Sequence, residues 1–277
     1  MNKILIGVTC FYNEEEVERY ILELLKQEQE TFEFVVSITT NNQNSKDVLL
    51  NYFQGLNINK SIIIRVYNAD QNLGYLNACL FGIKRCVDEF GIPDWIVISN
   101  TDIEFKENSF FSKYMQQQFD EDIWCVGPAI IDNSTQYRNP YIKVRPSKKS
   151  LQIKKIIYSS AFLNSLFFRI ASFYRKTKEK KQLAMEPSCD LYGIYGCFFI
   201  INYSCYEALE AVSKNIFMYG EENLLGEIVR SKKKKTYYWA GSLVYHNNNQ
   251  VTEKVPDKKK RKWKENSLKF IISNYYK

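Results

Sequence analysis

Two acidic residues follow an apolar run in residues 97–105, whose sequence is Val-Ile-Ser-Asn-Thr-Asp-Ile-Glu-Phe. Asp102 and Glu104 therefore stand two positions apart at the end of a predicted buried strand. Mg²⁺ and Mn²⁺ are hard cations that prefer carboxylate and phosphate oxygens, and they usually keep substrate phosphates as ligands. One carboxylate together with a diphosphate is thus a sufficient metal site. Acids that merely end a strand are the alternative interpretation.

A second acidic pair, Glu221 and Glu222, lies in the segment Phe-Met-Tyr-Gly-Glu-Glu-Asn-Leu at 217–224. A carboxylate held near a substrate can take the proton of an attacking hydroxyl group as a general base. Adjacent acids also suit the first turn of a helix, where they interact with the positive end of the helix dipole. From the residues alone, both interpretations stay open.

His246 is the only histidine of the chain, and it follows a predicted strand at 243–245. A single histidine is more often a structural residue whose hydrogen bonds are satisfied within the fold. Neutral imidazole is also a good ligand for Mn²⁺, so His246 is a second candidate metal ligand.

These side chains require a scaffold, and the first half of the chain alternates strand-like and helix-like segments. The predicted strands are 4–10, 32–39, 62–67 and 94–99, and the predicted helices are 15–27, a short one ending at 53, and 76–90. Strands that alternate with crossover helices indicate a parallel sheet with helices on both faces. In such sheets the ligand lies beyond the carboxyl ends of the strands.

All four predicted strand ends carry polar residues, at 11–13, 39–42, 68–74 and 100–104. Turn formation alone explains any one of these segments, because Asn, Asp and Gly favour turns. Their presence at all four ends favours a nucleotide site. Glycine-rich phosphate loops of the G-x-G-x-x-G or G-x-x-x-x-G-K-[ST] kind are absent, so an ordinary dinucleotide or P-loop protein is not indicated.

The second half of the chain has a different charge pattern. Residues 143–182 contain twelve basic residues and one acid, a local charge of +11, which leaves −4 for the rest of the total +7. Within this basic segment, 153–174 mixes apolar and basic residues as an amphipathic helix pair does. Further elements are predicted as a strand at 193–201, a helix at 204–212, strands at 236–239 and 243–245, and a basic tail that precedes a final apolar stretch.

Composition excludes several protein classes. Hydrophobic residues are 45% and aromatic residues 15%, so neither a disordered nor a fibrous chain is indicated. The seven cysteines form no C-x-x-C pair, which predicts free, mostly buried thiols in a reducing compartment rather than a zinc finger. The apolar run at the N-terminus is too short for a signal peptide, and no window offers the roughly 20 apolar residues of a membrane helix. We therefore expect a cytoplasmic chain, with peripheral contact to the inner face of the cell membrane still open.

Six motifs, in order, resemble those of family 2 glycosyltransferases with the GT-A fold, closest to the rhamnosyltransferase-like branch of bacterial surface polysaccharide synthesis. They are VTCFYN at 8–13, NLGYLN at 72–77, SNTDIEF at 99–105, GCFFI at 196–200, FMYGEE at 217–222 and VYH at 244–246. The resemblance spans roughly residues 3–250. The ordered set is far more specific than any single motif.

The resemblance implies an α/β fold with a central, mostly parallel sheet flanked by helices. It also implies inverting, metal-dependent transfer of a sugar from a nucleotide-diphosphate sugar to a glycan or lipid-diphosphate-linked acceptor. Asp102 and His246 would hold Mn²⁺ or Mg²⁺, and Glu222 would be the base, with Glu221 orienting it or binding the acceptor; which of the two is the base stays open. The implied nucleotide contacts are Thr9, Phe11, Asn13, Asn41, Asn72, Gly74, Asn100 and Thr101, and the implied contacts to the donor or acceptor sugar are Gly196 and Cys197.

The sequence departs from the family pattern at several positions. Thr39-Thr40-Asn41-Asn42 replaces the usual D-N-x-S, so the usual acidic contact to the base or ribose is missing. Asn100 replaces the first acid of the metal motif, which leaves Asp102 as the main side-chain ligand, and Glu104 is expected to point away from the site. Glu222 stands where the family usually has Asp, and Leu224 replaces a further acid of many relatives.

The expected organisation is a glycosyltransferase domain at 1–250, which includes a basic helical insertion at 143–182, and a basic tail at 251–277. The basic segment has two interpretations: a solvated loop, or a helix on an anionic membrane surface. A catalytically silent protein that binds membrane or nucleic acid is the alternative function, but no signature of nucleic-acid binding accompanies the basic residues, and we expect no nucleic-acid partner. A sugar-phosphate nucleotidyltransferase would need a phosphate loop that 8–13 lacks.

Overall fold

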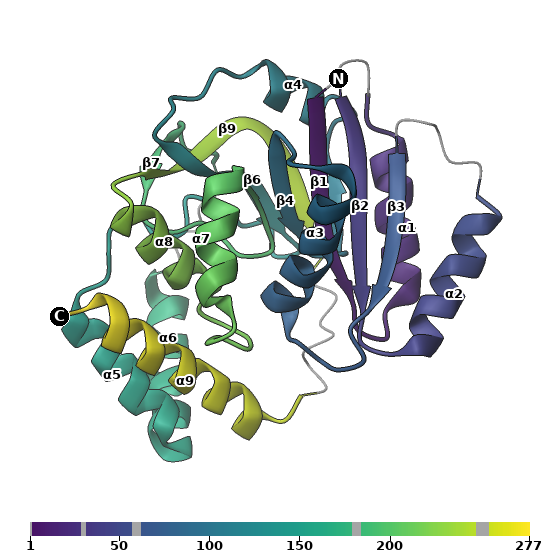
Figure 1. The fold of residues 1–277 in the computed structure, drawn as a ribbon. Coiled ribbons are helices and arrows are strands. Elements are labelled where there is room, and N and C mark those ends of the chain that lie inside the picture. Colours follow the sequence, from purple (N-terminus) through teal and green to yellow (C-terminus); the bar gives the residue numbers. More distant parts are fainter. Residues whose placement is uncertain (1, 29–31, 57–61, 179–183, 248–254) are drawn as a thin grey trace.

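The computed structural model describes residues 2–28, 32–56, 62–178, 184–247 and 255–277. One mixed sheet forms the centre of these residues, with strand order β3-β2-β1-β4-β8-β6-β9-β5, and β7 pairs with β9 (Figure 1). The strands are β1 (Asn2–Cys10), β2 (Phe32–Thr40), β3 (Ile62–Asn68), β4 (Trp95–Ser99), β5 (Ile103–Phe105), β6 (Ile123–Asp132), β7 (Cys189–Leu191), β8 (Phe198–Ile201) and β9 (Lys235–His246). The helices are α1 (Glu14–Leu25), α2 (Gln43–Gln54), α3 (Tyr75–Phe90), α4 (Phe110–Gln116), α5 (Lys148–Ser159), α6 (Ala161–Lys178), α7 (Tyr203–Ser213), α8 (Glu221–Ser231) and α9 (Asp257–Tyr275).

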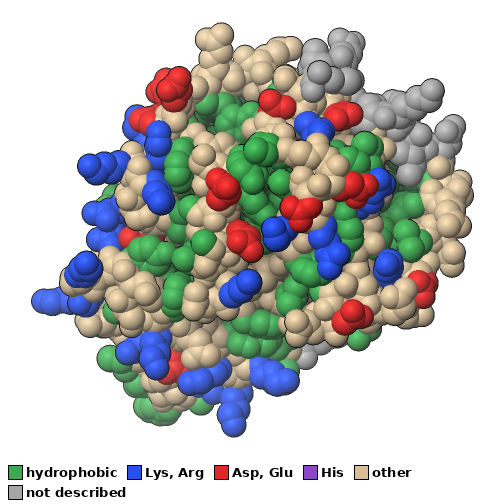
Figure 2. All heavy atoms as spheres, in the orientation of Figure 1, with side chains coloured by type: hydrophobic (Ala, Val, Ile, Leu, Met, Phe, Trp, Pro, Cys, Tyr) green, Lys and Arg blue, Asp and Glu red, His purple; other side chains and the backbone are tan. Residues whose placement is uncertain are grey.

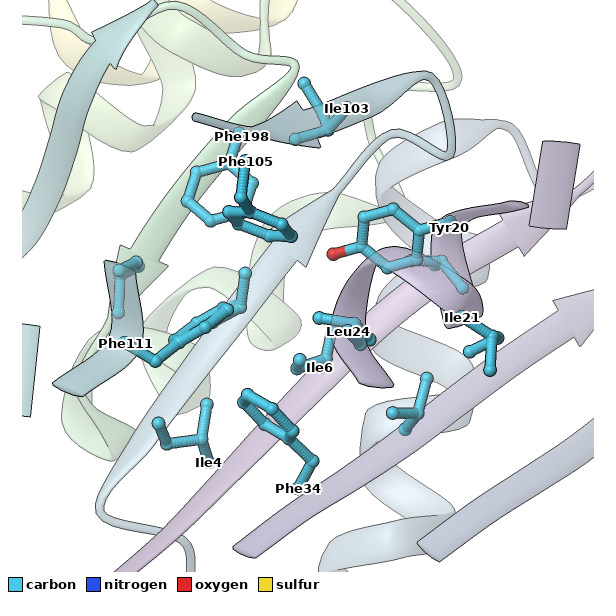
Figure 3. Packing of buried hydrophobic residues seen from close by; sticks show 14 of the residues in the cluster. Ile4, Ile6, Tyr20, Ile21, Leu24, Phe34, Ile103, Phe105, Phe111 and Phe198 are labelled. Carbon is cyan, nitrogen blue, oxygen red and sulfur yellow. The ribbon is translucent and has the colours of Figure 1, made fainter. Parts of the chain in front are cut away.

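Helices cover both faces of the sheet, as the alternating pattern predicted. Along β1, Ile4 and Ile6 pack with α1, α2 and α4, whereas Leu5 packs with α3 on the other face. Because both faces are buried, the strands read as continuous apolar runs. Figure 3 shows the first of these layers, where the aromatic rings of Phe34 and Phe111 meet, with centroids 4.8 Å apart.

The strand pairing changes from parallel to antiparallel next to β4. The four strands β1 to β4 are parallel, but β8 enters antiparallel between β4 and β6, and β5 pairs antiparallel with β9. The α/β class with helices on both sides is confirmed, and the longest strand pairings are parallel. Strands β5 and β6 were not predicted, and β9 is one strand with a register shift instead of two separate ones.

The basic segment is helical from residue 148 to residue 178, apart from Ser160 between the two helices. Residues 143–178 contain α5 and α6, as the amphipathic pattern predicted, and 179–182 lie outside the described residues. The structure differs from the expected tail at 251–277, because residues 257–275 form α9, which packs against α5 and α8. The positions 263, 267, 268 and 271 share one helix face, and this face turns toward the protein. The basic residues on the opposite face had concealed that pattern.

All seven cysteines are free thiols, and only Cys189 is not fully buried. Burial raises the pKa of the thiols of Cys10, Cys79 and Cys205. A thiol that stays protonated is a poor nucleophile and behaves as a small apolar side chain. In the described part of the chain, no helix is long and apolar enough to cross a membrane.

Candidate active site

A cavity of about 570 Å³ opens at the carboxyl ends of β1, β2 and β4. This is the edge of the sheet that the sequence indicated. Every predicted site residue lines the cavity: Thr9, Phe11, Asn13, Asn41, Asn72, Gly74, Asn100, Thr101, Asp102, Gly196, Cys197, Glu221, Glu222 and His246. The fold therefore brings together segments from both halves of the chain in one site.

Strand pairing positions the carboxylate of Asp102 beside the imidazole of His246. Asp102 directly precedes β5, His246 ends β9, and the register pairs Ile103 with His246. His246 Nε2 lies 3.3 Å from Asp102 Oδ1 and 3.4 Å from Asn100 Nδ2. Both side chains are largely buried, so the pair is held in a fixed orientation.

The donor set of this pair fits a divalent metal ion. A carboxylate oxygen and an imidazole nitrogen lie on the same wall of the cavity, and both are ligands that Mn²⁺ accepts. His246 Nδ1 is buried with no hydrogen-bond partner among the described residues. No group of three His, Cys, Asp or Glu side chains surrounds any point of the described residues. A metal ion held here would take its remaining ligands from a bound substrate or water.

Glu104 does not line the cavity, as expected, although residues two apart in one strand share a face. The two side chains diverge because Asp102 lies in the turn before β5, whereas Glu104 lies within β5. Its side chain is exposed and accepts a hydrogen bond from Asn247 Nδ2 at 2.5 Å. Asp102, two positions earlier, faces the cavity instead.

The two adjacent acids Glu221 and Glu222 have different surroundings. Tyr219 and Gly220 precede α8 with φ of 67° and 95°, and this left-handed turn lets the Tyr219 amide donate to Glu221 Oε1 at 2.8 Å. Glu222 points toward Gly196, where an added Cβ would lie 3.1 Å from Glu222 Oε1. Glu221 thus closes its own turn, while Glu222 faces the segment between β7 and β8.

Both carboxyl groups are easier to protonate than an exposed glutamate. Burial and the charge of Glu222 raise the pKa of Glu221 to about 8. Burial also raises the pKa of Glu222, and the amides of Glu222 and Gly196 and the charge of Lys264 oppose that increase. A carboxylate with a raised pKa is a stronger base than free glutamate, which suits general base catalysis.

The polar strand ends hold the cavity wall in shape. Asn13 Oδ1 accepts from the Phe11 amide at 2.7 Å, and Asn13 Nδ2 donates to Thr101 Oγ1 at 2.9 Å. Asn72 Oδ1 accepts from the Gly74 amide at 2.9 Å. The turn-forming role and the cavity-lining role therefore coincide in these residues.

Gly74 is required by its surroundings. Its φ of 78° lies in a region that other residues avoid, and an added Cβ would lie 1.9 Å from the carbonyl oxygen of Phe217. This close approach joins the turn after β3 to the segment that precedes the acidic pair.

Sequence reasoning missed an aromatic part of the wall. Trp263 on α9 lines the cavity, and its ring centroid lies 4.9 Å from that of Phe217 and 6.5 Å from that of Tyr219. Lys264 Nζ lies 4.6 Å from the ring centroid of Tyr219. The signal was the spacing of Trp263 with Ser267 and Ile271, four residues apart each, inside the supposed tail. Other lining residues that were not predicted include Glu16, Thr39, Thr40, Tyr195, Met218 and Val255.

The sequence of the chain matches the model of one protein family, and its structure resembles solved structures that share one fold. The model of glycosyl transferase family 2 matches residues 7–178, which is more than half of the chain. No curated protein sequence matches the chain.

Two solved structures resemble the chain in fold. A structure of GalNAc-T7 with UDP, GalNAc and Mn²⁺ has a TM-score of 0.56 and 13% identity, and the match covers 89% of this chain and 44% of that chain. A mannosyltransferase from Pyrobaculum calidifontis with GDP-Man and Mn²⁺ has a TM-score of 0.50 and 8% identity, and the match covers 90% of this chain and 57% of that chain. The chain thus spans about half the length of these two proteins. At these identities the likeness concerns the fold alone, which is the GT-A fold that the motifs implied.

Proposed function

The chain belongs to glycosyl transferase family 2, and on this premise we propose that it transfers a sugar from a nucleotide-diphosphate sugar to an acceptor hydroxyl. One observation carries the proposal. The neighbouring side chains of Asp102 and His246, whose donor atoms suit a divalent ion, and the half-buried carboxyl group of Glu222, whose pKa is raised, line the same cavity. Glycosyl transfer from a nucleotide diphosphate needs both a counter-charge for the leaving group and a base for the acceptor.

Asp102 and His246 would hold the divalent ion, Mn²⁺ or Mg²⁺. When bound there, such an ion would supply Lewis-acid stabilisation of the negative charge on the departing nucleoside diphosphate. The two solved structures that share the fold contain Mn²⁺, which supports this choice. His246 reaches the site from the end of β9 and Asp102 from the turn between β4 and β5, so a divalent ion held by the two side chains would also be available to a donor diphosphate.

Glu222 accepts the proton of the acceptor hydroxyl, and Glu221 positions it. The hydrogen bond from the Tyr219 amide to Glu221 fixes the turn, and this turn sets the direction of the next side chain. A single base without a covalent sugar intermediate corresponds to inversion at the sugar carbon, as the family resemblance implies. In this assignment Gly196 provides room for the Glu222 carboxylate, and Cys197 lines the cavity beside it.

The strand ends bind the nucleotide. Phe11 supplies an apolar face for the base, and Asn41 and Asn72 supply polar groups for the base or ribose. No acid occurs at 39–42, and Thr39 and Thr40 take that place on the wall. Thr9, Asn13, Asn100, Thr101 and Gly74 shape the wall through backbone turns and hydrogen bonds.

The motifs favour the rhamnosyltransferase-like branch, with a glycan or lipid-diphosphate-linked acceptor of bacterial surface polysaccharide synthesis at the inner face of the cell membrane. Because Trp263 lines the cavity, we propose that the catalytic unit includes α9 and does not end at residue 250.

The test is a panel of nucleotide sugars in the presence of Mn²⁺, read by thermal stabilisation and then by product release. Glycosyl transfer releases nucleoside diphosphate, a nucleotidyltransferase would release pyrophosphate, and a silent binding protein would release neither. Asp102→Asn should abolish turnover in a folded protein. If Glu222→Gln keeps more than about a tenth of the wild-type rate, a different group is the base.

A further inference from the structure

Helices α5 and α6 expose a large apolar surface that nothing in the described structure covers. We call it the α5–α6 surface and define it by the exposed residues Ile153, Ile156, Phe162, Leu163, Leu166, Phe167, Phe168 and Ile170. Phe162 is 73% exposed and Ile153 is 58% exposed. Exposed apolar side chains are ordinary when they are scattered singly, but their concentration on two consecutive helices, among basic residues, is typical of an interaction site.

The charges around this surface have one sign. Between residues 144 and 178 the chain has no acidic residue. Lys148, Lys149, Lys154 and Arg169 are exposed among the apolar side chains. In Figure 2, basic side chains gather beside hydrophobic ones at the lower left of the molecule, where Figure 1 has α5, α6 and α9. Lysine is depleted in protein–protein interfaces, whereas lysine and arginine beside phenylalanine and leucine are typical of helices that lie on a membrane.

The start of α5 is fixed to the rest of the protein. Arg145 Nε lies 2.8 Å from Glu227 Oε1, and the guanidinium carbon of Arg145 lies 3.9 Å from the ring centroid of Tyr276. Leu151 is the buried residue of α5. With α5 docked on α9 through this side, the outward residues Ile153 and Ile156 have a fixed orientation. The surface is therefore preformed at α5.

We propose that the α5–α6 surface docks on a bilayer that contains anionic phospholipids. The apolar side chains enter the boundary between head groups and acyl chains, and the basic side chains contact lipid phosphates. No membrane-spanning segment is needed for this mode of binding.

The docking surface lies one helix away from the catalytic cavity. Helix α5 packs against α9, and α9 contributes Trp263 to the cavity wall. Lys264 Nζ, on the same helix, lies 5.6 Å from the ring centroid of Tyr158 on α5. If the proposed transfer is correct, this arrangement suits an acceptor whose lipid part stays in the bilayer. The docking itself does not depend on the transfer.

Flotation of the full chain with lipid vesicles tests the proposal without any substrate. We expect binding to vesicles of phosphatidylcholine mixed with phosphatidylglycerol, weaker binding at high salt, and little binding to phosphatidylcholine alone. Each basic side chain near an anionic lipid surface adds to the free energy of membrane binding. Lys149→Glu with Lys154→Glu should therefore weaken vesicle binding at least about tenfold. Phe162→Ser with Phe167→Ser should weaken it by about the same factor, through loss of inserted apolar area.

Matched variants elsewhere on the surface provide the controls. Lys214→Glu with Lys232→Glu changes the net charge by the same amount, and Val48→Ser with Ile92→Ser removes exposed apolar residues far from α5 and α6 in the sequence. Both controls should bind vesicles like wild type. Loss of binding in the controls would overturn the proposal, because net charge or total apolarity would then explain the effect.

Two other results would also overturn it. Equal binding to vesicles with and without phosphatidylglycerol would remove the electrostatic argument. A dimer in sedimentation that dissociates in Phe162→Ser with Phe167→Ser, together with absent vesicle binding, would assign the surface to a second copy of the chain. Failure of sugar transfer with intact vesicle binding would instead concern the proposed function alone.

Discussion

The carboxylate of Glu222 lies against the backbone of Gly196, so closely that a Cβ at position 196 would be 3.1 Å from Glu222 Oε1. Most Cβ contacts in proteins are longer, and a methyl group there would displace the carboxylate by a few tenths of an ångström. The position of the proposed base thus depends on a residue from a different part of the chain.

Gly196→Ala should lower kcat for transfer by about tenfold or more while the protein stays folded, because a misplaced base loses its alignment with the acceptor hydroxyl. The measurement is steady-state kinetics with a donor found in the panel. Gly55→Ala is the matched control, since its Cβ would meet its nearest atom at 3.6 Å, an ordinary contact. A Gly196→Ala enzyme with wild-type kcat would mean that the close approach of Gly196 does not set the position of the base.

The stability of the protein should fall as pH rises through the titration of Glu221. Its folded pKa of about 8 lies above the ordinary value of 4.5, so the folded state binds the proton more tightly than the unfolded state. Stabilisation from this group is complete below about pH 4.5 and is lost as pH rises to about 8. Glu221→Gln should make this slope shallower, leaving the part that comes from Glu222, and should increase the free energy of unfolding at about pH 8 by on the order of 2 kcal/mol.

Urea denaturation of wild type and Glu221→Gln at several pH values measures this effect. Glu104→Gln, at an exposed position, serves as the control and should leave the slope unchanged. Parallel pH profiles for wild type and Glu221→Gln would contradict the assignment of the slope to this carboxyl group.

Gly74→Ala should destabilise the protein much more than Gly91→Ala. Both glycines have φ near 80°, so both variants bear the same backbone strain of about 1–3 kcal/mol. A Cβ added at Gly74 would lie 1.9 Å from the carbonyl oxygen of Phe217, which is a severe clash. A Cβ added at Gly91 would have no atom within 4 Å. The difference in unfolding free energy, measured by chemical denaturation, isolates the clash and should be about 2 kcal/mol or more. Equal losses would show that the two segments move apart freely.

Mn²⁺ together with a nucleoside diphosphate should raise the Tm of wild type but not of Asp102→Asn. A ligand at about a hundred times its Kd stabilises a protein by about 2.7 kcal/mol, and loss of the carboxylate ligand should remove most of this gain. Asp88→Asn is the control, because Asp88 is exposed on α3 and its ion pair with Lys84 is at the surface. An equal Tm shift in Asp102→Asn and wild type would exclude Asp102 as the metal ligand.

The regular first half of the fold followed from the sequence, because apolar runs of β1 to β4 alternate with amphipathic helices that begin and end near the expected residues. Strands β5 and β6 could not be predicted from the sequence. Ile103–Phe105 is too short to carry a pattern, and Ile123–Asp132 contains a glycine and a proline. Strand β9 pairs with β6, and the register shifts between Pro128 and Ala129 of β6. This irregularity explains why the sequence of β9 was interpreted as two short strands.

The cavity residues could be predicted where motifs lie at strand ends. They could not be predicted where long-range packing places a residue in the cavity wall. Asp102 and His246 were linked through the family resemblance, but their 3.3 Å approach results from the β5–β9 pairing, which has no local signal. Trp263 was concealed by the basic residues around it. A helix face made of positions 263, 267 and 271 becomes visible only when the charged residues are assigned to the opposite, solvent side.

Helix α9 follows every other cavity-lining element in the sequence, and this order has a consequence for the newly made protein. Chains grow at about 5–20 residues per second and fold from the N-terminal end first. The strand ends that face the nucleotide are therefore complete while the wall that carries Trp263 is still inside the ribosome. A translation arrest before residue 257 would leave a chain that has Asp102, Glu221 and Glu222 but an open side, so the cavity closes only after α9 has emerged.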